Sequence, residues 1–175
     1  MVVISDRVPP QSKEAEQSVL GSMIIDKEAI FAAVEMLVVE DFYSTAHQKI
    51  FEGIISLSEK GEPVDLVTLS EEMQRSQCLD DIGGRSYLVT LANAVPTAAN
   101  IQYHAQIVRE KAILRSLIQA ATGIVTRSFD SPANVDEFLD QSEQAIFEIG
   151  RRGKNQGFAS LKEVLVQAFD SIEKL

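Results

Sequence analysis

The longest uninterrupted helical pattern of the chain runs from about Asn100 to Phe129, and it constrains the fold more than any other segment. No proline lies between these two residues, and Gly123 is the only glycine. A helix of about thirty residues is far longer than the average globular helix of about 11–12 residues. Because most helical stability in proteins comes from packing an apolar face, such a helix needs partners along its length.

Two apolar stripes run along the second half of this segment. They lie about 100° apart around the helix axis, so the apolar face is broad. One stripe consists of Leu114, Ile118, Ala121 and Val125, and the other of Ile113, Leu117, Ala120 and Ile124.

A turn and a second long helix follow. Ser131 and Pro132 predict the turn, and Asn134 with Glu137 three residues later is close to a capping box. The two long helices predict an antiparallel helical hairpin over residues 99–150. Since each helix of a hairpin has only one partner helix, a broad apolar face on both predicts that something else covers the remainder.

The N-terminal half carries shorter helical patterns. After an N-terminal arm over residues 1–11, residues 12–98 predict a globular head of about five helices, with Ser12, Asp26 and Asp65 as N-caps. No strand pattern stands out. The sequence therefore predicts an all-α fold with a helical head, a long antiparallel hairpin and a tethered amphipathic helix.

The tethered helix lies at the end of the chain. Residues 151–159 predict a flexible linker, because their sequence is polar, basic and rich in glycine. Ser160 and Glu163 form a capping box for a helix over residues 160–175. A helix of about fifteen residues is marginal alone in water, so we expect it to dock on its own domain, another domain or a neighbouring subunit. Its apolar side includes Leu161, Leu165, Ala168 and Ile172.

The sequence shows no motif for catalysis, nucleotide binding or metal binding. The only Gly-Lys pair, Gly153–Lys154, is followed by Asn155 and lacks the rest of a phosphate-binding loop. His47 and His104 lack the Glu three residues earlier that di-iron helical bundles use. We therefore expect structural or surface roles for both histidines, and no catalytic, cofactor-binding or metal-binding residue in this chain.

Charge and composition narrow the function classes further. The net charge is −10, and an acidic surface repels phosphates, so we expect little direct nucleic-acid binding. The single cysteine, Cys78, cannot form an internal disulfide and favours a reducing compartment. No stretch reaches 18 apolar residues, so no membrane span is expected. Arg109, Lys111 and Arg115 on the long helix are interpreted as surface charges.

Five longer stretches carry a resemblance to a known family. In content, order and spacing they resemble the N-terminal region of the bacterial replicative DNA helicases of the DnaB family, over essentially the whole chain. The stretches are PPQSKEAEQSVLGSMIID (9–26), EDFYSTAHQKIFEGI (40–54), GEPVDLVTL (61–69), GGRSYLVTLANAVPTAANIQYHAQIVREKAILRSLI (83–118) and the final GFASLKEVLVQAFDSIEKL.

The resemblance implies a function in DNA replication. In this family the N-terminal domains pair through their hairpins, three pairs form a collar on a hexameric ring, and the collar binds primase. The linker helix docks on the ATPase domain of the neighbouring subunit. The ATPase domain, which binds ATP and Mg²⁺, is absent here, so the resemblance implies a fragment or an engineered piece of a longer helicase. It also implies the bacterial cytoplasm, or the plastid stroma, as the location.

The surplus apolar residues are divided between self-association and a partner, which the resemblance identifies as primase. Leu114, Leu117, Ala121 and Val125 are assigned mainly to hairpin packing and self-association, because a two-fold interface uses the same patch twice. Ile118 and Ile124 are assigned to the primase contact, with Tyr87 as an aromatic anchor. The competing interpretation makes these last three ordinary core residues. Docking of the linker helix is assigned to Leu161, Leu165, Ala168 and Ile172.

Two other functions stay open at this point. A stand-alone helical adaptor or regulator with the same fold would show the same patterns, and the coding sequence past Leu175 would separate it from a helicase. A small α-helical enzyme fits less well, because the sequence shows no nucleophile–base pair, metal-ligand set or phosphate loop. Thermal-shift screening against metals and nucleotides would test that alternative.

Overall fold

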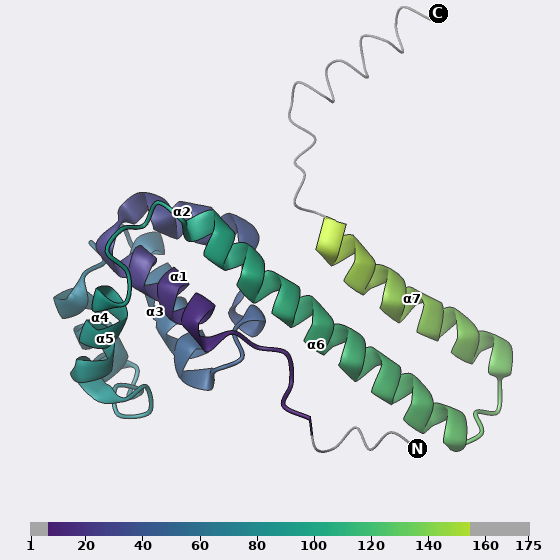
Figure 1. The fold of residues 1–175 in the computed structure, drawn as a ribbon. Helices are drawn as coiled ribbons and strands as arrows, with labels where there is room; N and C mark the ends of the chain where they lie inside the picture. The colour runs from purple at the N-terminus through teal and green to yellow at the C-terminus, as the bar shows by residue number, and fades with distance from the viewer. Residues whose placement is uncertain (1–6, 155–175) are drawn as a thin grey trace, which may run out of the picture. The chain divides into compact units, whose positions relative to one another are not determined.

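A computed structural model describes residues 7–154, and within that range no residue forms a β-strand. The all-α prediction is confirmed (Figure 1). The chain divides into two compact units between Ser116 and Leu117, within the longest helix. The elements are α1 (Lys13–Ile25), α2 (Lys27–Met36), the 3-10 turn η2 (Val39–Asp41), α3 (Thr45–Glu59), α4 (Leu66–Arg75), α5 (Gly84–Asn93), α6 (Ile101–Phe129) and α7 (Val135–Lys154).

Several helices of the first unit, including α1 and α4, begin at side-chain caps. The Ser12 hydroxyl accepts a hydrogen bond from the Ala15 N–H at 3.3 Å, and this fixes the start of α1. Asp65 caps α4 twice, because one carboxylate oxygen accepts from the N–H groups of Val67 and Thr68 at 2.8 and 2.9 Å. The backbone donors at Thr68 and Val67 lower the pKa of Asp65 below its ordinary value.

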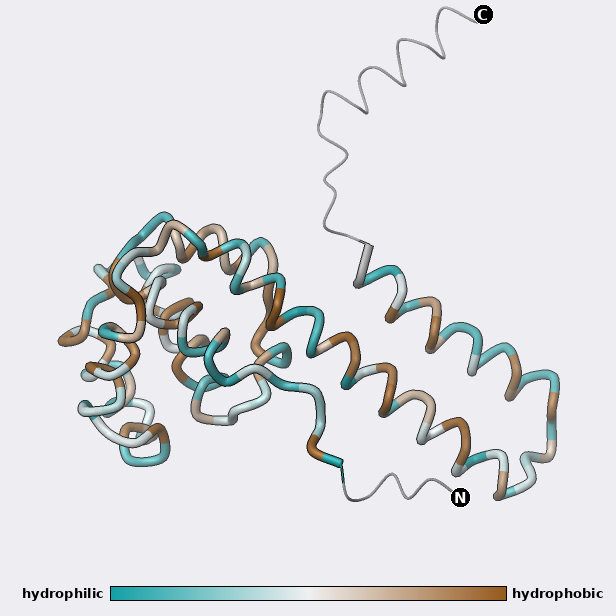
Figure 2. The backbone as a smooth tube through the Cα atoms, viewed as in Figure 1, coloured by the Kyte–Doolittle hydropathy of each residue, from teal (hydrophilic) through white to brown (hydrophobic). Residues whose placement is uncertain are grey.

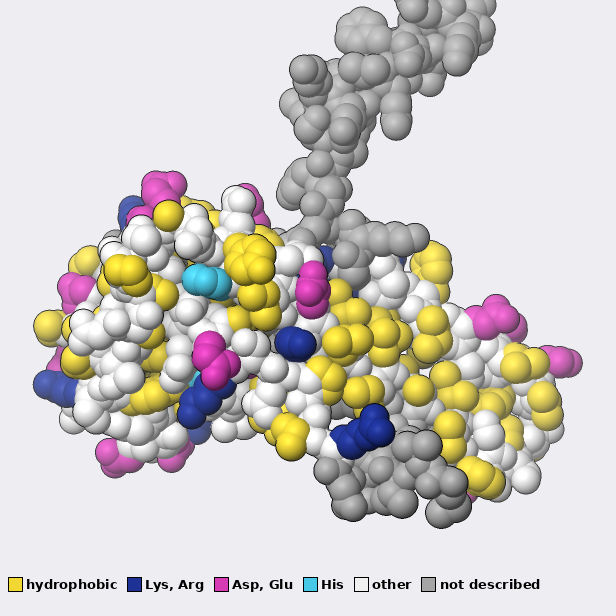
Figure 3. Space-filling model, viewed as in Figure 1, with side chains coloured by type: hydrophobic (Ala, Val, Ile, Leu, Met, Phe, Trp, Pro, Cys, Tyr) yellow, Lys and Arg dark blue, Asp and Glu magenta, His cyan; other side chains and the backbone are white. Residues whose placement is uncertain are grey.

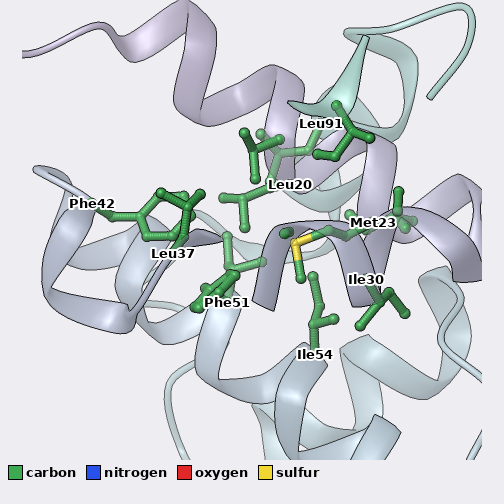
Figure 4. Close-up of a cluster of buried hydrophobic side chains, with 14 of the residues drawn as sticks. Leu20, Met23, Ile30, Leu37, Phe42, Phe51, Ile54 and Leu91 are labelled. Atoms are coloured by element: carbon green, nitrogen blue, oxygen red, sulfur yellow. The ribbon is translucent and has the colours of Figure 1, made fainter. Parts of the chain in front are cut away.

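The core of the first unit lies around α1, which packs against α2, α3 and α5. Leu20 and Met23 of α1 are completely buried, and the Phe42 and Phe51 rings pack 4.8 Å apart between centroids. Figure 4 shows these side chains converging from different segments. The core residues labelled there are Leu20, Met23, Ile30, Leu37, Phe42, Phe51, Ile54 and Leu91.

Two glycines allow the helices of this unit to approach closely. A Cβ added at Gly21 of α1 would lie 2.2 Å from the Leu91 carbonyl oxygen of α5. A Cβ at Gly53 of α3 would lie 2.1 Å from the terminal methyl carbon of Met73 on α4. The α1–α5 contact therefore depends on glycine at position 21, because the obstacle there is backbone, whereas at Gly53 the flexible end of Met73 can move aside.

The beginning of α6 is anchored in the first unit by two arginines. Arg109 is only 7% exposed, and it donates to the Met36 carbonyl oxygen at 3.4 Å. Arg115 donates to the carbonyl oxygens of Pro10 at 2.8 Å and Asp41 at 2.5 Å. The prediction that these arginines are surface charges is therefore wrong, because both bind backbone carbonyls that are distant in the sequence.

The described part of the second unit contains the end of α6 and the antiparallel helix α7 (Figure 1). Arg127 of α6 donates to the Gln141 side-chain oxygen at 2.6 Å and lies over the Phe138 ring, 4.8 Å from its centroid. Asn134 accepts from the Glu137 N–H at 3.2 Å, as the predicted cap requires. These contacts join the two helices close to their connecting turn.

The end of α7 differs from the sequence prediction. The helix continues to Lys154, although the linker was predicted to begin at residue 151. An ion pair between Arg151 and Glu148, 3.2 Å long and one helical turn apart, supports the added residues. The rest of the predicted linker and the predicted helix over residues 160–175 lie outside the described residues.

Candidate interaction surfaces

The two apolar stripes predicted on α6 differ in exposure. The first stripe is open to solvent: Leu114 is 45%, Ile118 44% and Val125 53% exposed, and Ala121 is exposed as well. The second stripe, Ile113, Leu117, Ala120 and Ile124, is half-buried throughout. Hydrophobic positions recur along this part of α6 in Figure 2. The helix therefore carries a row of apolar side chains that the other described residues, 7–154, leave open to solvent.

The helix α7 adds further exposed apolar side chains. Its Phe138 is buried, yet Phe147 is 66% exposed, and Phe129 at the end of α6 is 86% exposed. Figure 3 shows hydrophobic side chains crowding the visible surface of the hairpin. A surface of this kind is typical of a protein–protein interface rather than of a monomer. The other large exposed apolar residues of α7 are Val135, Leu139 and Ile146.

On α6, each residue predicted to contact primase shares its stripe with residues predicted for self-association. Ile118, assigned to primase, lies in the exposed stripe with three self-association residues, Leu114, Ala121 and Val125. Ile124, also assigned to primase, shares the half-buried stripe with Leu117. The assignments stay predictions. The four docking residues of the terminal helix, Leu161, Leu165, Ala168 and Ile172, lie outside the described residues.

Tyr87 lies apart from these stripes, on α5. It is half-buried and packs against the core of the first unit. Its hydroxyl oxygen lies 2.7 Å from His47 Nε2 and 3.2 Å from Gln17 Nε2, which donates to it. Tyr87 is therefore partly committed to contacts within the chain, and only the remainder of its ring can meet a partner.

The Tyr87 hydroxyl ends a buried polar chain that the sequence analysis did not identify. Glu16 and His47 are 2% and 1% exposed, and His47 Nδ1 lies 2.5 Å from a Glu16 carboxylate oxygen. Glu16 also accepts from the Tyr43 N–H at 2.7 Å and the Ser44 N–H at 3.4 Å. A signal was present in the sequence. Glu16 shares the apolar face of α1 with Val19, Leu20 and Met23, and His47 shares that of α3 with Ile50, Phe51 and Ile54.

Other polar side chains of the first unit form ion pairs. Glu72 is 7% exposed and pairs with Arg75 and, at 3.1 Å, with Lys60. Lys49 Nζ donates to the Asp81 carboxylate at 2.5 Å, and this hydrogen bond raises the pKa of Lys49. Within residues 7–154, no group of three or more His, Cys, Asp or Glu side chains is arranged to hold a metal ion. None of the described helices combines the length and the apolar character needed to cross a membrane.

Comparison with known proteins gives consistent matches in sequence. The profile of the DnaB-like helicase N-terminal domain family matches residues 8–110. The chain is 47% identical over 173 residues to the replicative DNA helicase DnaB of Geobacillus stearothermophilus. It is 45% identical over 173 residues to the replicative DNA helicase DnaC of Bacillus subtilis (strain 168). Each alignment covers 99% of this chain and 38% of the relative, so the chain spans less than half the length of these relatives.

Two solved structures are similar in fold. The crystal structure of the N-terminal domain of DnaB helicase from Mycobacterium tuberculosis matches 81% of this chain and 99% of that chain, with a TM-score of 0.77 and 45% identity. A structure of a DnaB-like replicative helicase and its interactions with primase matches 94% of this chain and 35% of that chain, with a TM-score of 0.65 and 26% identity.

Proposed function

Because this chain belongs to the DnaB-like helicase N-terminal domain family, we propose that it acts as a collar domain that assembles a replicative helicase and recruits primase. The observation that carries the proposal is the exposed stripe Leu114, Ile118, Ala121 and Val125 on α6. A row of large apolar side chains open to water is stabilised when a partner covers it.

Self-association is the first part of the proposal. The exposed apolar residues lie on both helices of the hairpin, and a two-fold axis would bring the same patch together from two chains. We assign Leu114, Leu117, Ala121 and Val125 to hairpin packing and pairing. Three such pairs would complete a hexameric collar. Light scattering of the purified chain tests this part, since a monomer at micromolar concentration contradicts pairing.

Primase recruitment is the second part. A similar solved structure is described with its interactions with primase, which supports primase as the partner class for this family. We assign Ile118, Ile124 and Tyr87 to that contact. Ile124→Asn distinguishes a partner contact from a core role. If Ile124 is a core residue, the substitution lowers the melting temperature strongly. If Ile124 contacts primase, the melting temperature stays nearly unchanged and primase stimulation is abolished.

The third part concerns a longer parent protein. The curated relatives are helicases of which this chain matches 38%, so we assign ATP and Mg²⁺ binding, DNA unwinding and hydrolysis to a part outside the chain. Residues 160–175, with Leu161, Leu165, Ala168 and Ile172, would dock on the ATPase domain of the neighbouring subunit. The relatives come from bacteria, which supports the bacterial cytoplasm as the location. Leu165→Asp in the longer protein should weaken ring assembly, and unchanged hexamer formation and ATPase coupling would contradict docking in trans.

A further inference from the structure

We propose that the buried residues Glu16 and His47 are positioning residues for Tyr87. They make the Tyr87 hydroxyl donate its hydrogen bond into the protein, so that Tyr87 offers a docking partner its ring and no hydrogen-bond donor. The inference rests on the proposed function, in which Tyr87 belongs to the primase contact. The primase contact would then use the apolar ring of Tyr87, and the buried Glu16 and His47 would determine the orientation of its hydroxyl.

The direction of the hydrogen bonds begins at Glu16. Its carboxylate accepts from two backbone donors, the Tyr43 N–H at 2.7 Å and the Ser44 N–H at 3.4 Å. A carboxylate with these donors is an acceptor for any third group. His47 Nδ1, 2.5 Å from the second carboxylate oxygen, must therefore carry the hydrogen.

The tautomer of His47 determines whether the Tyr87 hydroxyl donates or accepts. With Nδ1 protonated, the neutral ring has its lone pair on Nε2, which lies 2.7 Å from the Tyr87 hydroxyl oxygen. The hydroxyl satisfies Nε2 only by donating to it. Gln17 Nε2 then donates to the hydroxyl oxygen at 3.2 Å. In this arrangement the hydrogen bonds run from the Tyr87 hydroxyl to His47 and from His47 to Glu16, and each donor meets an acceptor.

The ring of Tyr87 is fixed as firmly as its hydroxyl. It lies parallel to the His47 ring, with 5° between the planes and 6.0 Å between the centroids. Gly83, at φ +94°, begins α5 beneath it, and a Cβ there would lie 3.2 Å from the Tyr87 Cβ. The side chain is thus held between α1, α3 and the first turn of α5 before any partner arrives.

Replacing one carboxylate oxygen of Glu16 by an NH₂ group should reverse the direction of these hydrogen bonds. In Glu16→Gln the amide oxygen keeps the short hydrogen bond from the Tyr43 N–H. The amide NH₂ replaces the oxygen that faces His47 Nδ1, and the longer contact from the Ser44 N–H to that oxygen is lost. That NH₂ donates to Nδ1, so the hydrogen of His47 moves to Nε2. The Tyr87 hydroxyl then accepts from His47, and its own hydrogen turns outward. A partner that covers an outward donor without an acceptor loses affinity.

The tautomer is measured first, by ¹⁵N NMR of the histidine side chains in the 175-residue chain. The sequence has two histidines, so the spectrum contains two imidazoles, and His104→Gln assigns them. We expect the Nδ1–H tautomer for His47 in the wild type and the Nε2–H tautomer in Glu16→Gln. An Nε2–H tautomer or an imidazolium in the neutral-pH wild type overturns the proposal without any substitution.

Primase binding is measured next, as a double-mutant cycle between Glu16→Gln and Tyr87→Phe. Glu16→Gln should weaken binding by about threefold or more when Tyr87 is present, and should have no effect in the Tyr87→Phe background. A purely structural role for Glu16 would weaken binding equally in both backgrounds and overturns the proposal. Tyr103→Phe, at a tyrosine that is 70% exposed on α6, is the matched control and should change neither measurement.

The two measurements also separate this inference from the function on which it rests. A chain that binds primase but carries the Nε2–H tautomer contradicts the positioning role alone. A chain with the Nδ1–H tautomer that binds no primase contradicts the proposed function, and the positioning role for that contact falls with it.

Discussion

Gly21 of α1 lies so close to Leu91 of α5 that a Cβ added at Gly21 would sit 2.2 Å from the Leu91 carbonyl oxygen. The obstacle is backbone, so the two helices must separate to admit a methyl group. Gly21→Ala should therefore lower the free energy of unfolding by about 1–3 kcal/mol. Urea denaturation of the purified variant measures this change, and an unchanged midpoint would show that the α1–α5 contact is loose.

Gly123 of α6 provides the matched control for that substitution. A Cβ at Gly123 meets nothing within 4 Å, and the residue lies inside a helix. Gly123→Ala should stabilise the chain by up to about 1 kcal/mol, because alanine has the higher helix propensity. A loss of stability in the monomer would contradict the open space found around Gly123.

Arg115 should not be replaceable by lysine. Its guanidinium donates to two carbonyl oxygens, of Pro10 and Asp41, and lies 5.7 Å from the centre of the Tyr43 ring. Lysine keeps the charge but cannot present two donors in a fixed fork. Arg115→Lys should lower the free energy of unfolding by about 1–3 kcal/mol, since hydrogen bonds from charged groups are the stronger ones. Lys111→Arg on the same helix is the control, and equal denaturation midpoints for both variants would refute the anchor.

The cap at Asp65 should make α4 sensitive to acid. Its folded pKa is lowered from 3.8 by the backbone donors of Thr68 and Val67. A lowered folded pKa means that the stabilisation is present above pH 3.8 and is lost as the pH falls through the lower folded value. Asp65→Ala should cost about 1 kcal/mol at pH 7. The difference from wild type, followed by denaturation from pH 7 down to pH 3, should shrink; a constant difference would show that the charge has no part in the cap.

Self-association should depend on the exposed stripe of α6. Val125 is 53% exposed, so Val125→Asp should leave the fold of one chain intact while placing a charge in the paired interface. Sedimentation equilibrium should show a larger monomer fraction than in the wild type. Gln119→Asp, at an exposed glutamine on the side of α6 away from both stripes, controls for the added negative charge. Equal association of Val125→Asp and wild type would place the interface elsewhere.

Local patterns predicted the helical elements well. Ser12, Asp26 and Asp65 cap helices because an N-cap needs only a neighbouring backbone N–H, and such contacts span two or three residues. The period of apolar residues on α6 also defined two stripes, and the structure shows that they differ in exposure. These features depend on spacing along one helix, which the sequence displays directly.

Contacts between distant segments were not predictable in the same way. Arg115 binds a carbonyl 105 residues away, and Glu16 meets His47 across 31 residues. No local pattern specifies such partners, because they depend on how the helices pack. The place of Glu16 among apolar neighbours on α1 indicates burial, but not the partner that it meets. The end of α7 was misjudged for a related reason: the glycine and arginines after Ile149 suit a linker, yet the Arg151–Glu148 pair supports helix.

Isothermal titration of the chain with the primase of the same organism tests most directly whether the hairpin carries the primase contact. Ile118 is 44% exposed, so Ile118→Asn should leave the melting temperature nearly unchanged. We expect saturable binding by the wild type and no measurable binding by the variant under the same conditions. Absence of binding by the wild type, or binding of the variant with the wild-type affinity, would contradict it.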